Sequence, residues 1–121
     1  MNVENVREYC LSKQGVTESF PFDEYTLVFK VMNKMFALVP LERIPSQVNL
    51  KCDPEWAISL REEYDGIIIP GYHMSKTHWN TLFLEQVPPE FIRELIDHSY
   101  DLVVAKLSKK LKEELKGYRI K

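Results

Sequence analysis

Two alternating segments separated by a short polar turn constrain the fold more than any other feature of the sequence. Residues 26–31 and 35–39 are rich in β-branched and aromatic side chains, and Asn33 between them tolerates a positive φ angle. The pair therefore predicts a β-hairpin. Alternation places Leu27, Phe29 and Val31 on one face of the hairpin.

Further strands and helices follow from the same patterns. Residues 48–52, 67–69 and 80–84 predict three more strands, and helical spacing predicts helices over 3–13, 54–63 and from 89 onward. Asn2 and Asp53 are expected N-caps, and a bend is expected near His98-Ser99. The predicted fold is α+β with two layers: a mainly antiparallel five-stranded sheet with helices on one face, in the order α-β-β-β-α-β-β-α.

Bulk composition predicts one domain over residues 1–121 that ends in a basic tail from about 106. The chain has 121 residues, of which 45% are hydrophobic, and this suits a single core. It shows no apolar run of about 20 residues and no signal-peptide pattern, so we expect a cytoplasmic protein without membrane contact. Cys10 and Cys52 lack metal or redox spacing and are expected to be reduced packing residues. We expect a monomer more than an oligomer.

The most chemically specific stretch covers residues 66–83. It holds Tyr72, His73 and His78 in a loop between two predicted strands, together with Lys76 and Trp79. Two histidines five residues apart in a loop do not supply the three or four ligands of a metal site, so we expect no metal and no other cofactor. The sequence also lacks a nucleophile elbow, a P-loop and a Gly-x-Gly-x-x-Gly motif, which predicts no catalytic residues and a protein that is not an enzyme.

Four segments together resemble the MmcQ/YjbR family, and the resemblance covers almost the whole chain. They are the Ser-Phe-Pro-Phe turn at 19–22, the hairpin with Asn-Leu-Lys-Cys-Asp-Pro at 49–54, the Pro-Gly-Tyr-His-Met and His-Trp-Asn motifs within 70–80, and Ser-Tyr-Asp-Leu-Val-Val-Ala-Lys-Leu at 99–107. The resemblance implies the same element order and a DNA-binding function. It also implies two wings, the hairpin at 28–38 and the loop at 70–79, with phosphate contacts from Lys30, Lys34, Lys51 and Lys76.

The residues themselves permit such a surface. If helices cover one face of the sheet, Lys30, Lys51 and Thr81 lie on the other, with Lys76 and Trp79 at its margin. Ammonium groups meet phosphates and aromatic rings stack on bases, so this mixture suits nucleic acid. The net charge of −2 means that binding would need a local basic patch. Seven Lys/Arg against two Glu in residues 106–121 supply a further one, a local charge of +5.

Other interpretations remain open at this stage. Trp79 can instead be packed, with each lysine paired to a glutamate. The loop at 72–79 can serve as the recognition edge of an adaptor for a protein or small molecule, or a loop histidine can act as an acid or base. Phe20 and Phe22 are expected to plug one end of the core, with ligand stacking as the alternative.

Overall fold

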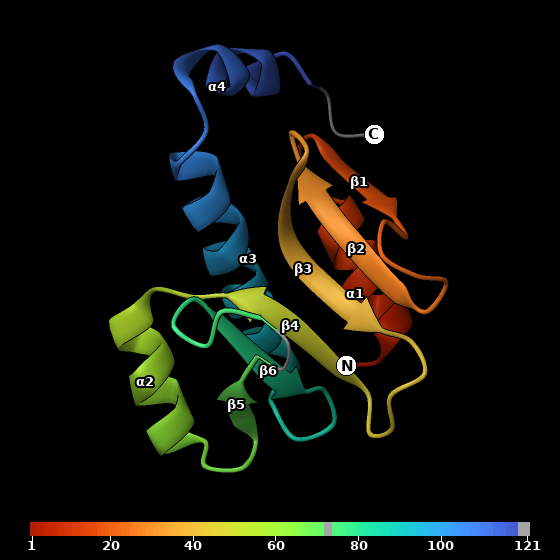
Figure 1. Cartoon of the computed structure of the whole chain (residues 1–121), viewed down its shortest axis with the longest axis vertical. Helices are drawn as coiled ribbons and strands as arrows, with labels where there is room; N and C mark the ends of the chain where they lie inside the picture. Colours follow the sequence, from red (N-terminus) through yellow and green to blue (C-terminus); the bar gives the residue numbers. More distant parts are fainter. Residues whose placement is uncertain (72–73, 119–121) are drawn as a thin grey trace.

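The computed structural model describes residues 1–71 and 74–118, and these form a six-stranded antiparallel sheet with four helices (Figure 1). The strands lie in the order β1-β2-β3-β4-β6-β5. The elements in chain order are α1 (Val3–Leu11), β1 (Val16–Ser19), β2 (Thr26–Val31), β3 (Lys34–Pro40), β4 (Gln47–Lys51), α2 (Pro54–Glu63), β5 (Ile68–Pro70), β6 (Trp79–Phe83), α3 (Pro89–Ala105) and α4 (Lys109–Lys116). The predicted α+β class is confirmed, and β1 is a sixth strand that the sequence analysis did not assign.

Both predicted N-caps are present. The Asn2 side chain accepts the Asn5 backbone N–H at 2.8 Å, and the Asn5 side chain accepts the Asn2 N–H in return. Asp53 accepts the Trp56 N–H at 3.1 Å, with Pro54 at the first position of α2. These contacts satisfy backbone donors that have no partner inside the helix, and they fix where α1 and α2 begin.

The predicted hairpin is formed by β2 and β3. Its turn consists of Met32 and Asn33, which have φ angles of 48° and 66°. Val28 pairs with Leu38 across the two strands, and a bulge near Lys30 shifts the register toward the turn. Asn33 therefore adopts the left-handed conformation that its position predicted.

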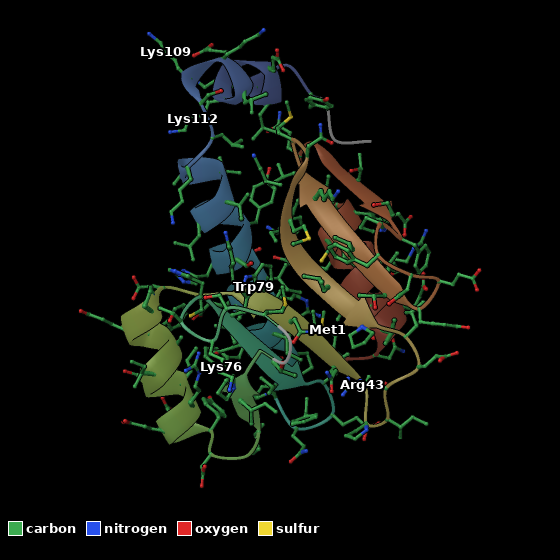
Figure 2. All side chains as sticks on the ribbon, viewed as in Figure 1. Met1, Arg43, Lys76, Trp79, Lys109 and Lys112 are labelled. Atoms are coloured by element: carbon green, nitrogen blue, oxygen red, sulfur yellow. The ribbon has the colours of Figure 1, made fainter. Side chains whose placement is uncertain are left out.

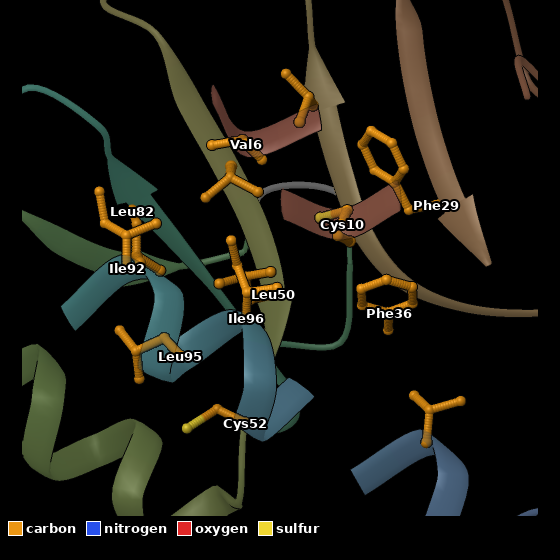
Figure 3. Packing of buried hydrophobic residues seen from close by; sticks show 14 of the residues in the cluster. Val6, Cys10, Phe29, Phe36, Leu50, Cys52, Leu82, Ile92, Leu95 and Ile96 are labelled. Atoms are coloured by element: carbon orange, nitrogen blue, oxygen red, sulfur yellow. The ribbon is translucent and has the colours of Figure 1, made fainter. Parts of the chain in front are cut away.

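One face of the sheet carries the main core (Figure 3). Val6 and Cys10 from α1 and Ile92 and Ile96 from α3 are fully buried against strand residues, among them Phe29. The predicted inward positions on β2, β4 and β6 all lie in this cluster. Cys10 and Cys52 are buried free thiols, and burial raises their pKa values to about 12 and about 11. The residues that face the helices are therefore the ones that the alternating pattern of the sequence predicted to point inward.

The end of the chain differs from the prediction. Helix α3 runs through His98 and Ser99 without interruption, and the helical run breaks instead before α4, which Ser108 caps. The Ser99 hydroxyl donates to the Phe36 carbonyl at 2.5 Å and accepts the Lys51 N–H at 2.9 Å. Because its hydrogen bonds go to the sheet, Ser99 does not compete with its own helix. None of the four helices in the described part of the chain is long and apolar enough to cross a membrane.

The environment of His98 predicts that the stability of the protein depends on pH. Its Nε2 accepts the Asp53 N–H at 3.0 Å, and its ring packs edge-on against Trp56. Burial lowers the pKa of His98 below its ordinary value of 6.5. A depressed pKa means that the stabilisation is complete above pH 6.5 and is lost as the pH falls through the folded-state pKa. We expect the free energy of unfolding to decrease from pH 6.5 toward 4.5, at the lower end of which carboxylates with ordinary pKa values of about 4 begin to titrate as well.

Denaturant unfolding across this pH range tests the assignment. The variant His98→Gln retains an acceptor without a titrating ring, so its stability should change less between pH 6.5 and 4.5 than that of the parent protein. Equal pH dependence in the two proteins would show that other groups are responsible.

Candidate nucleic-acid interface

The second face of the sheet is not covered by any helix in the described residues. Figure 1 looks onto this face, with α1 and α3 behind the sheet. Register places Lys30 opposite Met35, Leu38 opposite Asn49, and Lys51 opposite Trp79. We call this surface, formed by the outward residues of β2, β3, β4 and β6, the open face.

Trp79 is not the solvent-exposed indole that a stacking platform requires. It is 6% exposed and forms a second apolar cluster with Val28 and Leu38, against which Met35 and Met74 pack. The Lys51 amine lies 5.9 Å from the centre of the indole ring. The expectation that solvent reaches this ring is wrong, because the ring packs against Val28 and Leu38 and the side chains of Met35 and Met74 pack against the same cluster.

Gly71 makes this arrangement of Trp79 possible. Its N–H donates to the Trp79 carbonyl at 2.9 Å, and a Cβ atom at position 71 would lie only 2.9 Å from the Trp79 Cβ. Real side chains do not tolerate that approach. The glycine therefore lets the connection pass directly against the strand that carries the indole.

The polar residues in the middle of the open face are also more enclosed than expected. Thr81 is 1% exposed, and its hydroxyl donates to the Asn49 side-chain oxygen. Gln47 and Asn49 are each 8% exposed. Thr81 therefore lies on the predicted face, but its side chain is buried and bonds to the neighbouring strand, so it is not accessible to a ligand.

The predicted lysines are accessible in different degrees. Lys34 and Lys76 are exposed, whereas Lys30 and Lys51 are partly buried. Lys34 begins β3 beside the hairpin turn, and Lys76 lies in the β5–β6 connection, where its carbonyl accepts the Arg61 guanidinium (Figure 2). None of these four amines forms an ion pair with a described residue. The alternative in which glutamates neutralise them is therefore wrong.

Lys51 lies next to Lys106, which the sequence analysis had placed in the basic tail. A cavity of about 170 Å³ is bordered by Lys51, His78 and Lys106, with Asp53 also at its rim. Burial lowers the pKa of Lys51, and the charge of Lys106 lowers it further. Two ammonium groups this close favour binding of an anion. Ser99 of α3 contacts the Lys51 backbone, and Lys106 follows seven residues later on the same side of the helix, a spacing that could have signalled this pair.

Of Tyr72, His73 and His78, the structure describes His78 alone, which borders the cavity shared by Lys51 and Lys106. Tyr72 and His73 lie outside the described residues. His78 is exposed, and its backbone carbonyl accepts the Cys52 N–H at 2.8 Å. Within residues 1–71 and 74–118 there is no group of three His, Cys, Asp or Glu side chains that could hold a metal ion.

The aromatic turn before β2 contradicts the expected core plug. Phe20 is 48% exposed and Phe22 is 62% exposed, and Tyr25 in the same connection is 51% exposed. Asp23 fixes this turn by accepting the backbone N–H groups of Tyr25 and Thr26 at 2.8 and 2.7 Å. These rings are therefore presented to solvent, which favours the stacking alternative.

A protein-family model for YjbR matches residues 11–102. The chain belongs to the YjbR family. It is 32% identical to YjbR of Escherichia coli K12 over 86% of this chain and 88% of the relative, and 34% identical to YbdF of E. coli O157:H7 over 88% of each. Both relatives are described as uncharacterized proteins. The resemblance found in the sequence motifs is thus confirmed.

Solved structures agree with this family membership. The crystal structure of Deinococcus radiodurans protein DR2400, which has a DUF419 domain, aligns with a TM-score of 0.88 and 40% identity, covering 95% of this chain and 88% of that protein. A crystal structure from Pseudomonas syringae aligns with a TM-score of 0.71 and 30% identity over 84% of this chain and 98% of the other. The YjbR-family fold therefore accounts for nearly all of the chain.

Proposed function

We propose that this YjbR-family protein is a non-catalytic nucleic-acid-binding protein that contacts the phosphates of DNA through lysines on and beside the open face. The observation that carries the proposal is the cavity of about 170 Å³ that Lys51 and Lys106 border together, while neither amine has an acidic ion-pair partner among the described residues. A bound phosphate would supply the negative charge that these two ammonium groups lack. Lys30 lies on the same face and extends the site across β3.

The basic helix α4 supports the same proposal at one end of the molecule. Its lysines outnumber its glutamates four to two, and Lys109 and Lys112 point away from the core (Figure 2). Leu115 of α4 is 6% exposed and lies against Gly15, so the helix is held to the body of the protein. The basic segment is therefore positioned to add phosphate contacts.

The packed position of Trp79 defines the kind of binding that is proposed. A buried indole cannot stack on bases, so the lysines must supply affinity through the backbone phosphates. Such contacts release counterions, and neutralising about three phosphates predicts a slope of about −3 for log affinity against log salt on duplex DNA. The adaptor alternative used the loop at 72–79 as its recognition edge, and the burial of Trp79 removes one aromatic side chain from that edge.

Charge reversal at the lysine pair tests the proposal. Fluorescence anisotropy of a labelled duplex should show binding at about 20 mM salt that weakens steeply toward about 200 mM. The variant Lys51→Glu/Lys106→Glu should bind at least about tenfold more weakly and show a shallower salt dependence, since each lost phosphate contact reduces the slope by about 1.

Arg93→Glu provides the charge-matched control for the single reversals Lys51→Glu and Lys106→Glu. Arg93 is an exposed cation on α3, and it borders a separate cavity with Tyr9 of α1 on the helix side of the sheet. Its reversal should change affinity by less than either single lysine reversal does. No binding at low salt, or equal losses in the control and the single lysine variants, would overturn the proposed function.

A further inference from the structure

The open face contains a second and larger cavity, of about 430 Å³, where the β1–β2 and β3–β4 connections meet the sheet. Leu38 and Met35 contribute an apolar floor, and Phe22 and Met74 contribute walls from two different connections. This volume lies within the range of about 300–1,000 Å³ that is usual for small-ligand sites. The cavity is distinct from the Lys51–Lys106 hollow, with which it shares no lining residue.

Two enclosed amides border this cavity without the partners that buried amides normally have. Gln47 and Asn49 are two residues apart on β4, so they share a side of the strand, and each is 8% exposed. The Asn49 oxygen accepts the Thr81 hydroxyl, but its NH₂ group bonds to no described residue, and the Gln47 amide makes no side-chain hydrogen bond to one. Every fully enclosed side-chain N or O atom in the described residues has a hydrogen-bond partner. The unpaired amide atoms of Gln47 and Asn49 are therefore not fully enclosed, and they open into the cavity.

The turn that directly follows Phe22 is fixed by its own hydrogen bonds. Phe22 is 62% exposed, and the adjacent Asp23 anchors its turn with two backbone hydrogen bonds. These bonds lower the pKa of Asp23, so the carboxylate stays charged. Asp23 and Arg43 both border the cavity, so its rim carries one negative and one positive charge and does not select for a simple anion. A flat neutral ring with polar atoms on its edge fits these surroundings better.

We infer that this cavity binds a nucleobase, with the ring against Phe22 and the base edge hydrogen-bonded to Gln47 and Asn49. Every base carries an acceptor beside a donor on its pairing edge, and side-chain amides bind such edges. Lys30 pairs across the strands with Met35 of the cavity floor, so an ammonium group lies close to where an attached phosphate would be. For a base within a strand the inference rests on the proposed function, whereas for a free nucleotide it stands alone.

Three kinds of probe distinguish a base within a strand from a free nucleotide. The first is the set of four deoxynucleoside monophosphates, the second is a labelled single-stranded octamer, and the third is an abasic sugar-phosphate octamer of the same charge. Isothermal titration and fluorescence anisotropy at low salt should show that the base-containing octamer binds more tightly than the abasic one. Phe22→Ala and Gln47→Met should each weaken binding of the base-containing octamer by about tenfold, within the range for loss of one base–aromatic stack.

Phe20→Ala is the matched control, because Phe20 lies in the same exposed turn but does not border the cavity. It should leave all affinities unchanged. Equal binding of the base-containing and abasic octamers, unaffected by Phe22→Ala, would overturn the base site while leaving phosphate binding intact. Binding of monophosphates that depends on Phe22, without octamer binding, would support the base site for a free nucleotide and overturn it for a base within a strand. Failure of all three probes to bind would overturn the base site, and the duplex titration above tests the proposed function separately.

Discussion

Replacing Trp79 with alanine is expected to lower the free energy of unfolding by about 3–5 kcal/mol, the usual cost of truncating a large buried aromatic residue. The indole is 6% exposed and holds together the apolar cluster with Val28 and Leu38. Its removal would also leave Met35 and Met74 without the surface on which they pack. Urea unfolding followed by circular dichroism measures the loss, because Trp56 fluorescence alone would not report on this region.

The same variant separates packing from nucleic-acid stacking. Trp79→Phe should retain most of the apolar contact and lose less stability than Trp79→Ala. At a temperature where Trp79→Ala is still folded, its affinity for DNA should stay close to that of the parent. A stable Trp79→Ala protein with strongly reduced DNA affinity would show that the indole is a binding residue and that its packed position is not the functional one.

Ser99→Ala is expected to destabilise the protein by about 2–6 kcal/mol, although it removes a single oxygen atom. The Ser99 hydroxyl is fully buried and bonds to the Phe36 carbonyl of β3 and the Lys51 N–H of β4. Its loss leaves two backbone groups without a side-chain partner, at about 1–3 kcal/mol for each enclosed group. Equilibrium unfolding in urea measures the change.

Ser59→Ala is the control for the serine substitution. Ser59 is exposed on α2, and its hydroxyl bonds only to the Glu55 carbonyl of its own helix. We expect its replacement to change stability by less than about 0.5 kcal/mol, as for most surface sites. An effect of Ser99→Ala as small as that of Ser59→Ala would mean that the two sheet groups find other partners.

The elements of this fold could be predicted because their signals are local. Asn2 and Asp53 cap the helices that they were expected to cap, and alternation identified the inward positions of β2 and β4. Strand β1 was missed because its four residues, Val-Thr-Glu-Ser, are too few and too polar to show a period. It is held instead by pairing with β2 and by the ion pair of Glu18 with Arg7 at 2.8 Å.

The surface was harder to predict because it depends on contacts between distant segments. Alternation assigned Trp79 to the open face, but it could not show that Met74 and the strands would enclose the indole. Lys106 was read as the start of a tail, although docking of α3 on the sheet brings its charge close to Lys51. The exposure of Phe20 and Phe22 also went against their hydrophobic character, because Asp23 holds the turn away from the core.

The close approach of Gly71 to Trp79 also limits how this sequence can diverge. A larger residue at position 71 would push the strand away or displace the indole, so it could be accepted only together with a compensating change in β6. Substitutions at these two sites should therefore be correlated among relatives that keep this connection. A combinatorial library randomised at both positions would be expected to recover folded variants as matched pairs, with few tolerated single changes at position 71.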